Sequence, residues 1–160
     1  LPTEVQWEYA CRAGTASGMY FGGPDADHSR YANLADVTSK KVWHWLQPGD
    51  SAFNDRVFAT ASVGSYAPNA WGLHDMHGNA WEWTRSTRRP YPYRETDGRN
   101  TDSPDGRKAV RGGGWRDRPI RCRSASRLCY QPYQVVHDVG FRVVCEVTDP
   151  EAKVASALGH

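Results

Sequence analysis

The sequence predicts a single α+β domain that is rich in loops and low in regular secondary structure. One helical pattern near the N-terminus is followed by several short strand patterns, with long stretches rich in glycine and proline between them. The 160 residues include 15 glycines, 10 prolines, 7 tryptophans and 8 tyrosines. This composition favours an irregular fold held by aromatic packing, and the length is sufficient for one hydrophobic core.

The first predicted element is a helix over residues 2–12. Thr3 suits the N-cap, and Gln6 three residues later completes a capping box. The side chains expected on the buried face share the i, i+3, i+4 spacing of one helical stripe: Trp7, Ala10 and Cys11. The Ala-Gly pair at residues 13–14 is predicted to end the helix.

The rest of the chain is predicted to alternate short strands with long loops. The strand patterns cover residues 61–66, 81–84, 108–115, 121–127 and 139–147. Residues 14–62 show little periodicity apart from short ordered pieces at 31–34 and 42–46. Because so long a structureless loop is unusual in a compact domain, we expect it to be functional or ordered by a ligand. Residues 85–107 are predicted to form an exposed loop, and residues 148–160 a tail with little to pack.

Charge and hydropathy argue against two classes of partner. The formal net charge is +2, and acidic residues interrupt the basic cluster between Arg85 and Arg127. The surface is therefore mixed in sign and does not predict nucleic-acid binding. The sequence has no run of about 18 apolar residues, so no membrane-spanning helix is predicted.

The four cysteines leave two interpretations open. Cys11, Cys122, Cys129 and Cys145 have no CxxC spacing, so a zinc site is not predicted. An even number permits two disulfides, which would favour an extracytoplasmic location. Free buried thiols in a cytosolic protein fit the sequence nearly as well, so the compartment stays unassigned.

Residues 69–83 combine three tryptophans with oxygen donors. Gly78-Asn79 is a turn signal, and the turn's carbonyls with Asp75 and Glu82 would suit a hard cation such as Ca²⁺. On this stretch alone, a packed aromatic turn with solvated carboxylates is the simpler interpretation. Further oxygen donors lie in the long loop, where a cation could gather them or ordinary turn chemistry could use them: Asn33, Asp36, Asp50 and Asp55.

Five sequence blocks occur in a family-specific order. They lie at residues 1–9, 68–83, 110–115, 123–127 and 139–142. Together they resemble the sulfatase-modifying-factor family, that is, the formylglycine-generating-enzyme domain. The resemblance implies a variant of the C-type-lectin-like fold. It also implies that the chain up to residue 147 is the C-terminal portion of the family domain, so that an N-terminal segment or a partner chain completes the fold.

The resemblance implies one or two Ca²⁺ ions. One set of ligands would be the Asn33 side chain, the Leu34 carbonyl, the Asp55 side chain and the Val57 carbonyl. The other would be the Asp75 side chain, carbonyls near Gly78 and Ala80, and the Glu82 carboxylate. Ligands that are all oxygen fit Ca²⁺ better than zinc or copper.

The resemblance does not extend to the family's oxidative chemistry. Formylglycine generators have two cysteines with four residues between them, shortly after a Gly-Gly-Ser, and this pair binds copper. Here Gly114 stands in place of the serine, and Cys122 and Cys129 are separated by six residues. Copper and formylglycine generation are therefore not expected. A family disulfide would correspond to Cys11–Cys145, with Cys145 two residues beyond the expected place but on the same strand face.

The sequence thus predicts a calcium-stabilised binding or accessory module that takes a protein or peptide ligand. Its candidate surface, which could also be merely exposed, is rich in tyrosine and arginine: Arg116, Asp117, Arg118, Tyr130, Tyr133, His137 and Asp138. A first alternative is a metal-dependent oxidase or oxygenase that uses His74, Asp75 and His77, with His44 or His137. A second is a variable ligand-binding receptor of a diversity-generating element, which would vary the segment 116–138.

Overall fold

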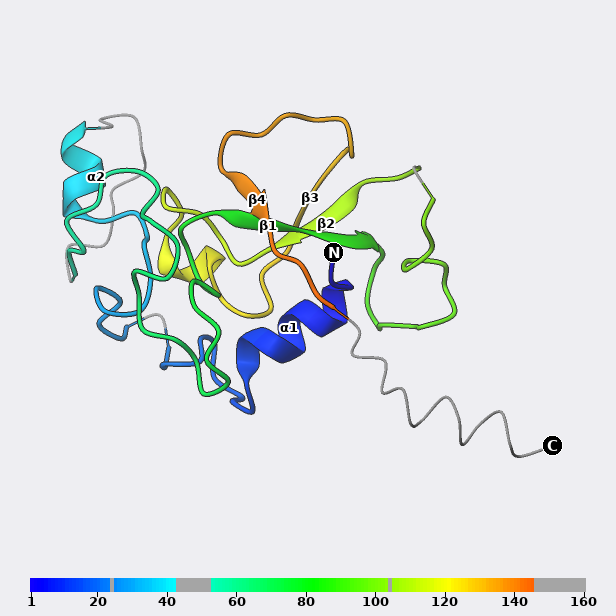
Figure 1. Cartoon of the computed structure of the whole chain (residues 1–160), viewed down its shortest axis with the longest axis horizontal. Helices are drawn as coiled ribbons and strands as arrows, with labels where there is room; N and C mark the ends of the chain where they lie inside the picture. The colour runs from blue at the N-terminus through cyan, green and yellow to red at the C-terminus, as the bar shows by residue number, and fades with distance from the viewer. Residues whose placement is uncertain (24, 43–52, 104, 146–160) are drawn as a thin grey trace.

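A computed structural model of the chain describes residues 1–23, 25–42, 53–103 and 105–145. Its elements, in chain order, are α1 (Glu4–Arg12), α2 (Val37–Val42), β1 (Trp81–Thr87), β2 (Lys108–Arg111), the short 3₁₀ helix η1 (Pro119–Arg121), β3 (Leu128–Tyr130) and β4 (Val139–Phe141). Long connections make up most of the remaining chain (Figure 1). The loop-rich α+β fold expected from the sequence is confirmed.

Helix α1 begins and ends where the sequence predicts. The hydroxyl of Thr3 accepts from the Gln6 N–H at 3.2 Å, and Gln6 Oε1 accepts from the Thr3 N–H at 2.8 Å, so the capping box is formed. Ala13 closes the helix in the left-handed conformation and donates its N–H to the Tyr9 carbonyl. Trp7 and Cys11 face the core.

The four strands form one mixed sheet in the order β3-β2-β1-β4. Strand β1 pairs antiparallel with β2, placing Glu82 opposite Arg111, and parallel with β4, placing Trp81 opposite Val139. Strands β2 and β3 are antiparallel. Helix α1 packs on one side of β1 and β2, and the connection between β3 and β4 stands on the other side (Figure 1).

Buried ion pairs fasten α1 to the sheet. Glu4, at the first turn of the helix, accepts two bonds from Arg127 at 2.5 and 2.7 Å. Arg111 of β2 is fully buried, bonds to Glu8 and lies 5.5 Å from the Trp7 ring. Because both acidic residues face the sheet from one helical stripe, these pairs fix the rotation of α1 as well as its position.

The hydrophobic core has two parts. Trp7, Cys11 and Met76 pack between α1 and the sheet. A second cluster lies among the loops and comprises Met19, Ala32, Leu34, Phe53 and Cys122. The aromatic packing expected from the composition is present in both parts, since Trp7 and Phe53 are buried.

Two predicted strands are wrong and two are too long, since β2 ends at Arg111 and not at residue 115. Residues 61–66 form a turn, because the Ala61 N–H donates to the Asn79 side chain and the Ser65 N–H to the Ser62 carbonyl. Residues 121–127 also turn, since Cys122 N–H bonds back to Pro119 of η1, and strand pairing starts only at β3. Strand β4 covers three residues of the longer pattern. The predicted piece at 42–46 lies outside the described residues beyond Val42, as does the tail 148–160.

Helix α2 was not expected from the sequence. Asp36 caps it, because its Oδ1 accepts from the Ser39 N–H at 2.9 Å while Ser39 Oγ accepts from the Asp36 N–H at 2.8 Å. This pairing of an N-cap with the third helical residue is a signal that the sequence does carry. Among the described residues, no helix is long and apolar enough to cross a membrane.

Candidate functional site

The two segments predicted to bind Ca²⁺ touch each other. Asn33 and Gly78 form an isolated parallel bridge, and the Asn79 N–H donates to the Asn33 carbonyl at 2.8 Å. Gly78 has φ +74°, and a Cβ added there would lie 2.2 Å from the Asn33 carbonyl oxygen. Only glycine therefore permits this contact, which holds the two loops against each other.

The side chain of Asn33 leaves a buried oxygen without a partner. Its amide nitrogen donates to the Ala59 carbonyl at 2.7 Å and to Asn79 Oδ1 at 3.2 Å. Its Oδ1 is buried and accepts no hydrogen bond within the described part of the chain. A buried acceptor that is left unpaired costs stability, and a bound cation would satisfy it.

Two carboxylates lie on the segments that carry this amide and its Ala59 partner. Asp36 Oδ2 accepts from the Asp55 N–H at 3.0 Å, so the segments 33–36 and 55–59 run side by side. Asp55 accepts from the Val57 N–H and from the Tyr66 hydroxyl, both at 2.8 Å. Burial, with a contribution from the Asp36 charge, raises the pKa of Asp55 to about 6. The sequence identified Asp36 as an oxygen donor, and Asp50 lies outside the described residues.

Asp75 provides another buried oxygen without a hydrogen-bond partner. It has a left-handed backbone with φ 58°, and its Oδ2 accepts from the Gly64 N–H at 2.6 Å. Its Oδ1 is buried and, within the described residues, has no hydrogen-bond partner. Asp75, Ala80 and Glu82 line one pocket of about 470 Å³, and the other predicted ligand of this set, Gly78, is buried outside that lining.

Glu82 already has strong partners. Arg142 donates to both carboxylate oxygens at 2.5 Å, and Trp7 Nε1 donates to Oε2 at 2.6 Å. A cation in this pocket would share Glu82 with a guanidinium. By contrast, none of the ion pairs within the described residues involves Asp36, Asp55 or Asp75. The donor set around Asn33 and Asp55 therefore suits a hard cation better than the set that ends at Glu82.

The candidate binding surface divides into buried braces and exposed side chains. Asp117 is 7% exposed and accepts from Trp81 Nε1 at 2.7 Å and from the Gly114 N–H at 3.1 Å. Asp138 is 2% exposed and accepts from Arg116 Nε at 2.7 Å. These two carboxylates hold the segment in place and do not face solvent.

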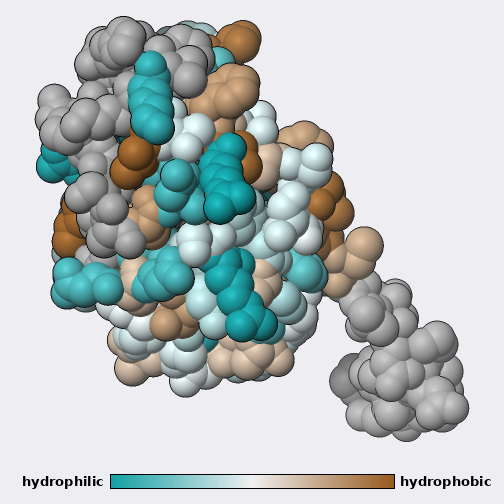
Figure 2. Space-filling model, turned by 90° about the vertical axis from the view of Figure 1, so that its left-hand side faces the viewer, coloured by the Kyte–Doolittle hydropathy of each residue, from teal (hydrophilic) through white to brown (hydrophobic). Residues whose placement is uncertain are grey.

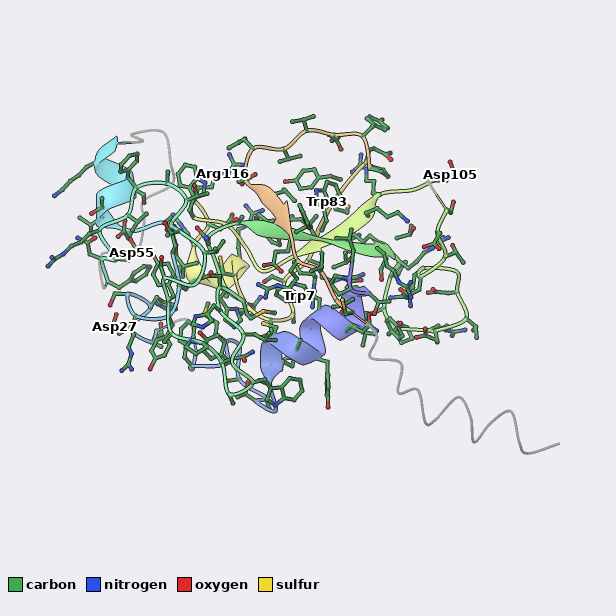
Figure 3. The ribbon with its side chains drawn as sticks, in the orientation of Figure 1. Trp7, Asp27, Asp55, Trp83, Asp105 and Arg116 are labelled. Carbon is green, nitrogen blue, oxygen red and sulfur yellow. The ribbon has the colours of Figure 1, made fainter. Side chains whose placement is uncertain are left out.

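The remaining residues of the candidate binding surface are exposed or half-buried. Arg118 and His137 are exposed, and Tyr133 is 81% exposed. Arg116 and Tyr130 are half-buried, the Tyr130 ring lying 6.1 Å from that of Trp83. Figure 3 shows Arg116 on the other side of the sheet from Trp7.

All four cysteines are free thiols in the structure, and the expected Cys11–Cys145 disulfide is not formed. Cys11 is buried, and its sulfur lies 3.6 Å from both His77 Nε2 and Ser124 Oγ, whereas Cys145 is exposed. Burial raises the pKa of the Cys11 thiol to about 12.

Cys122 and Cys129 have different surroundings. Cys122 is fully buried in the loop core, where a Cβ added at Gly113 would lie 2.2 Å from its sulfur, and burial raises its pKa well above the usual range. Cys129 is half-buried in β3 and lines a separate pocket. The two thiols therefore belong to different parts of the fold, the loop core and the sheet.

The histidines proposed for an oxidase are engaged elsewhere. His77 Nδ1 donates to the Cys122 carbonyl at 2.7 Å, and its Nε2 accepts from the Tyr20 N–H at 3.2 Å. Burial lowers the pKa of His77 to about 4, so the ring is neutral. His74 bonds to the Tyr66 carbonyl at 2.7 Å. Within the part of the chain that the structure describes, no three His, Cys, Asp or Glu side chains are placed to hold a metal, and His44 falls outside it.

Comparison with known proteins places these features in context. Residues 1–147 match the family described as the sulfatase-modifying factor enzyme 1-like domain. The chain is 30% identical to the formylglycine-generating enzyme of Bos taurus over 154 residues, which cover 91% of this chain and 38% of the bovine protein. It is 27% identical to the inactive Cα-formylglycine-generating enzyme 2 of Mus musculus, covering 94% of this chain and 44% of that protein.

Solved structures agree with the sequence relatives. PvdO from Pseudomonas aeruginosa superposes with a TM-score of 0.68 at 29% identity, covering 88% of this chain and 50% of PvdO. Variable protein 1 from Treponema denticola superposes with a TM-score of 0.65 at 27% identity, covering 88% of this chain and 45% of that protein. The chain therefore spans about two fifths to one half of the length of these relatives.

Proposed function

This chain belongs to the sulfatase-modifying factor enzyme 1-like domain family, and on that premise we propose that it is a calcium-stabilised binding or accessory module and not a formylglycine generator. The observation that carries the calcium part is a coincidence of position. Three side-chain oxygens among the described residues are buried without hydrogen-bond partners: Asn33 Oδ1, Asp75 Oδ1 and Asp138 Oδ1. The first two each belong to a ligand set that the family resemblance implies, and Asp138 lies outside both sets. The Asn33 and Asp75 oxygens would gain a partner from a bound Ca²⁺.

The proposed primary site is the set around Asn33 and Asp55. The side chains of Asn33 and Asp55 and the carbonyls of Leu34 and Val57 would hold the ion, with Asp36 adding negative charge beside them. Ca²⁺ there would offset the repulsion between two neighbouring carboxylates. The proposed secondary site uses Asp75 and Ala80, with Gly78 shaping the loop, and it is weaker because Glu82 is shared with Arg142.

A calcium titration followed by thermal unfolding tests this proposal. At free Ca²⁺ of about 100 times its Kd we expect a stabilisation of roughly 2.7 kcal/mol, which raises Tm by about 5–10 °C for a domain of this size. EGTA should reverse the shift. Mg²⁺ should produce little of it, because Mg²⁺ demands stricter octahedral geometry.

Single substitutions separate the two sites. Asp55→Asn should remove most of the calcium-induced shift, and Asp75→Ala a smaller part. Asp102→Asn, which removes the same charge from an exposed loop position, is the matched control and should respond like the wild type. An unchanged Tm with Ca²⁺ in the wild type would rule the proposal out, as would equal losses in all three variants.

The cysteine geometry supports the non-catalytic part of the proposal. Cys122 is enclosed by the loop core, whereas Cys129 lies on β3 and lines a surface pocket. A relative of similar identity is named as an inactive formylglycine-generating enzyme. Incubation with copper(I), oxygen and cysteine-containing peptides should therefore yield no peptide aldehyde by mass spectrometry. Aldehyde formation that Cys122→Ser abolishes would contradict this part.

The proposed binding surface is formed by Arg118, Tyr133 and His137. The buried residues Asp117 and Asp138 anchor the segment that carries these three side chains. Tyrosine and arginine on a rigidly anchored loop are typical of protein and peptide recognition. Tyr133→Ala should weaken binding of whichever peptide a display library selects. Tyr9→Ala, at an exposed tyrosine of α1 on the other side of the sheet (Figure 1), is the control and should not. Equal effects of both variants would contradict the assignment.

A variable receptor is a second candidate, favoured by the similarity to Treponema denticola variable protein 1. It predicts that the exposed positions of the segment 116–138 differ among copies of the gene in one genome while Asp117 and Asp138 stay fixed. Copies that vary at the two buried carboxylates would contradict it, because those residues bond to Trp81 and Arg116.

We also propose that a further segment of the family domain docks on the free edge of β4. Strand β4 ends the sheet order, and within the described residues it pairs with β1 alone. Phe141 and Val143 are 69% and 72% exposed, and the chain spans only part of its relatives' length. Hydrogen exchange of the β4 amides should slow in a longer form of the protein. Equal exchange in both forms would contradict this docking.

A further inference from the structure

A pocket of about 480 Å³ lies where β1 ends and β2 begins. It is formed by residues along the loop 88–107, together with Thr87 of β1 and Cys129 of β3. Asp105, which lines it, and Asp55 of the proposed calcium site lie at opposite ends of the molecule (Figure 3). The pocket is therefore separate from the calcium loops, and nothing in the proposed function accounts for it.

Three arginines line this pocket: Arg88, Arg89 and Arg107. The Arg88 N–H donates to the Arg107 carbonyl at 2.8 Å, one step beyond the Thr87–Lys108 pair of the β1–β2 ladder. Like charges that face each other across a ladder destabilise it. Arg88, Arg89 and Arg107 are all exposed, so their guanidinium groups are accessible to a ligand.

The neighbouring acidic residues offset only part of this charge, although Asp97 does interact with Arg89. Asp97 is occupied by Arg99, which donates to it from Nε and from Nη2 at 2.6–3.0 Å. Among the described residues that line the pocket, Asp105 is the one carboxylate, against three guanidinium groups. Lys108 Nζ donates to the hydroxyl of Thr87 at 3.2 Å and brings a further positive charge to the edge of the pocket. The pocket therefore has an excess of positive charge.

We propose that this pocket binds a doubly charged tetrahedral oxyanion, a phosphate or sulfate group, carried on a small polar molecule. The planar fork of arginine pairs two N–H donors with two oxygens of such a group. The volume is within the range of small-molecule sites and exceeds the size of a bare ion. Hydroxyls of Thr101 and Ser103 in the lining suit the polar remainder of the ligand.

Isothermal titration at constant ionic strength tests the site with defined probes: inorganic phosphate, inorganic sulfate, glucose 6-phosphate and, as the uncharged match, glucose. We expect both ions and glucose 6-phosphate to bind and glucose not to bind. The phosphate and sulfate arms show which oxyanion is preferred. Binding of glucose 6-phosphate should strengthen as pH rises through about 6, where its second proton leaves, while sulfate binding stays constant.

Substitutions locate the site. Arg88→Gln and Arg107→Gln should each weaken binding about tenfold or more, because each removes charge-assisted hydrogen bonds. Arg94→Gln removes the same charge from an exposed position of the same loop outside the pocket lining and should bind like the wild type. Arg88→Lys keeps the positive charge but loses the forked pair of N–H donors. Its affinity should lie between those of the wild type and Arg88→Gln.

A wild-type measurement keeps the test independent of variant folding. The arginine Nε–H resonances of Arg88, Arg89 and Arg107 should shift on addition of phosphate, and that of Arg94 should not. Absence of binding by the wild type to both oxyanions would overturn the proposal. It would also be overturned by uniform shifts of all arginine resonances, or by equal weakening in Arg94→Gln.

Discussion

The two sides of the molecule treat buried charge in opposite ways. Between α1 and the sheet, each buried or half-buried carboxylate meets a guanidinium: Glu4 with Arg127, Glu8 with Arg111 and Glu82 with Arg142. On the loop side, Asp36, Asp55 and Asp75 meet backbone N–H groups and hydroxyls instead. Figure 2 shows the surface at this end as a mosaic of polar and apolar residues.

The difference bears on which half of the fold the proposed Ca²⁺ would stabilise. A carboxylate paired with arginine is neutralised by the chain itself. A buried carboxylate that has only neutral donors has no opposite charge to offset its own. Burial then disfavours the ionised form, and the pKa of Asp55 is raised for this reason. The helix side thus neutralises its own carboxylates, whereas on the loop side the proposed Ca²⁺ would do so.

The largest expected effect tests the ion pairs of the helix side. Arg111→Met should destabilise the fold by about 3–5 kcal/mol, because it removes one partner of a buried pair as well as bonds to the carbonyls of Ser124 and Ser126. Arg12→Met is the matched control, since Arg12 bonds the same Glu8 at the surface and should cost at most about 1 kcal/mol. Urea unfolding measures both. Equal costs would mean that burial of the pair does not matter.

A pH series tests the junction between the two sides, where His77 contacts Cys11 of α1 and Cys122 of the loop core. Burial lowers its folded pKa to about 4, so the unfolded chain binds the proton first as pH falls. The His77 contribution is therefore full above about pH 6.5 and is lost toward pH 4, a change of roughly 3 kcal/mol.

The measurement compares the pH dependence of stability in the wild type and in variants. This comparison is needed because Asp55 changes stability with pH in the direction opposite to His77. Its raised pKa makes the folded state bind a proton first, which favours folding as pH falls through about 6. Unfolding free energies of the wild type and His77→Gln between pH 7 and 4 isolate the histidine term. His74→Gln, at an exposed position, should follow the wild type. A pH slope unchanged in His77→Gln would show that His77 does not carry this dependence.

The parts of the fold that the sequence predicts well are those set by local chemistry. The capping box of α1 depends on Thr3 and Gln6 alone, and both contacts are formed. The five sequence blocks identified the family and hence the fold, because their order is specific even where each block is short. Strands β1 and β2 were also located to within a few residues.

The parts that sequence reasoning missed depend on distant partners. Residues 61–66 have a strand pattern, but the Asn79 side chain takes the Ala61 N–H that a neighbouring strand would have used. The buried bracing by Asp117 and Asp138 depends on Trp81, which lies far away in the chain. Polar residues in a loop cannot be divided into exposed and buried without those contacts, so the predicted surface mixed the two kinds.

The smallest expected difference between a variant and its control, about 1–3 kcal/mol, tests how the two loops proposed to bind Ca²⁺ are joined. Gly72 and Gly78 have nearly the same backbone, with φ +76° and +74°, but a Cβ meets nothing within 4 Å at Gly72 and lies 2.2 Å from the Asn33 carbonyl at Gly78. Each alanine variant should cost about 1–2 kcal/mol for its left-handed conformation, and Gly78→Ala about 1–3 kcal/mol more for the overlap. Gly78→Ala should also lower the calcium-induced rise in Tm, because the Asn33 carbonyl must move, whereas Gly72→Ala should keep it. Equal losses of stability in the two variants, measured by urea unfolding, would show that the loops are not held together by this contact.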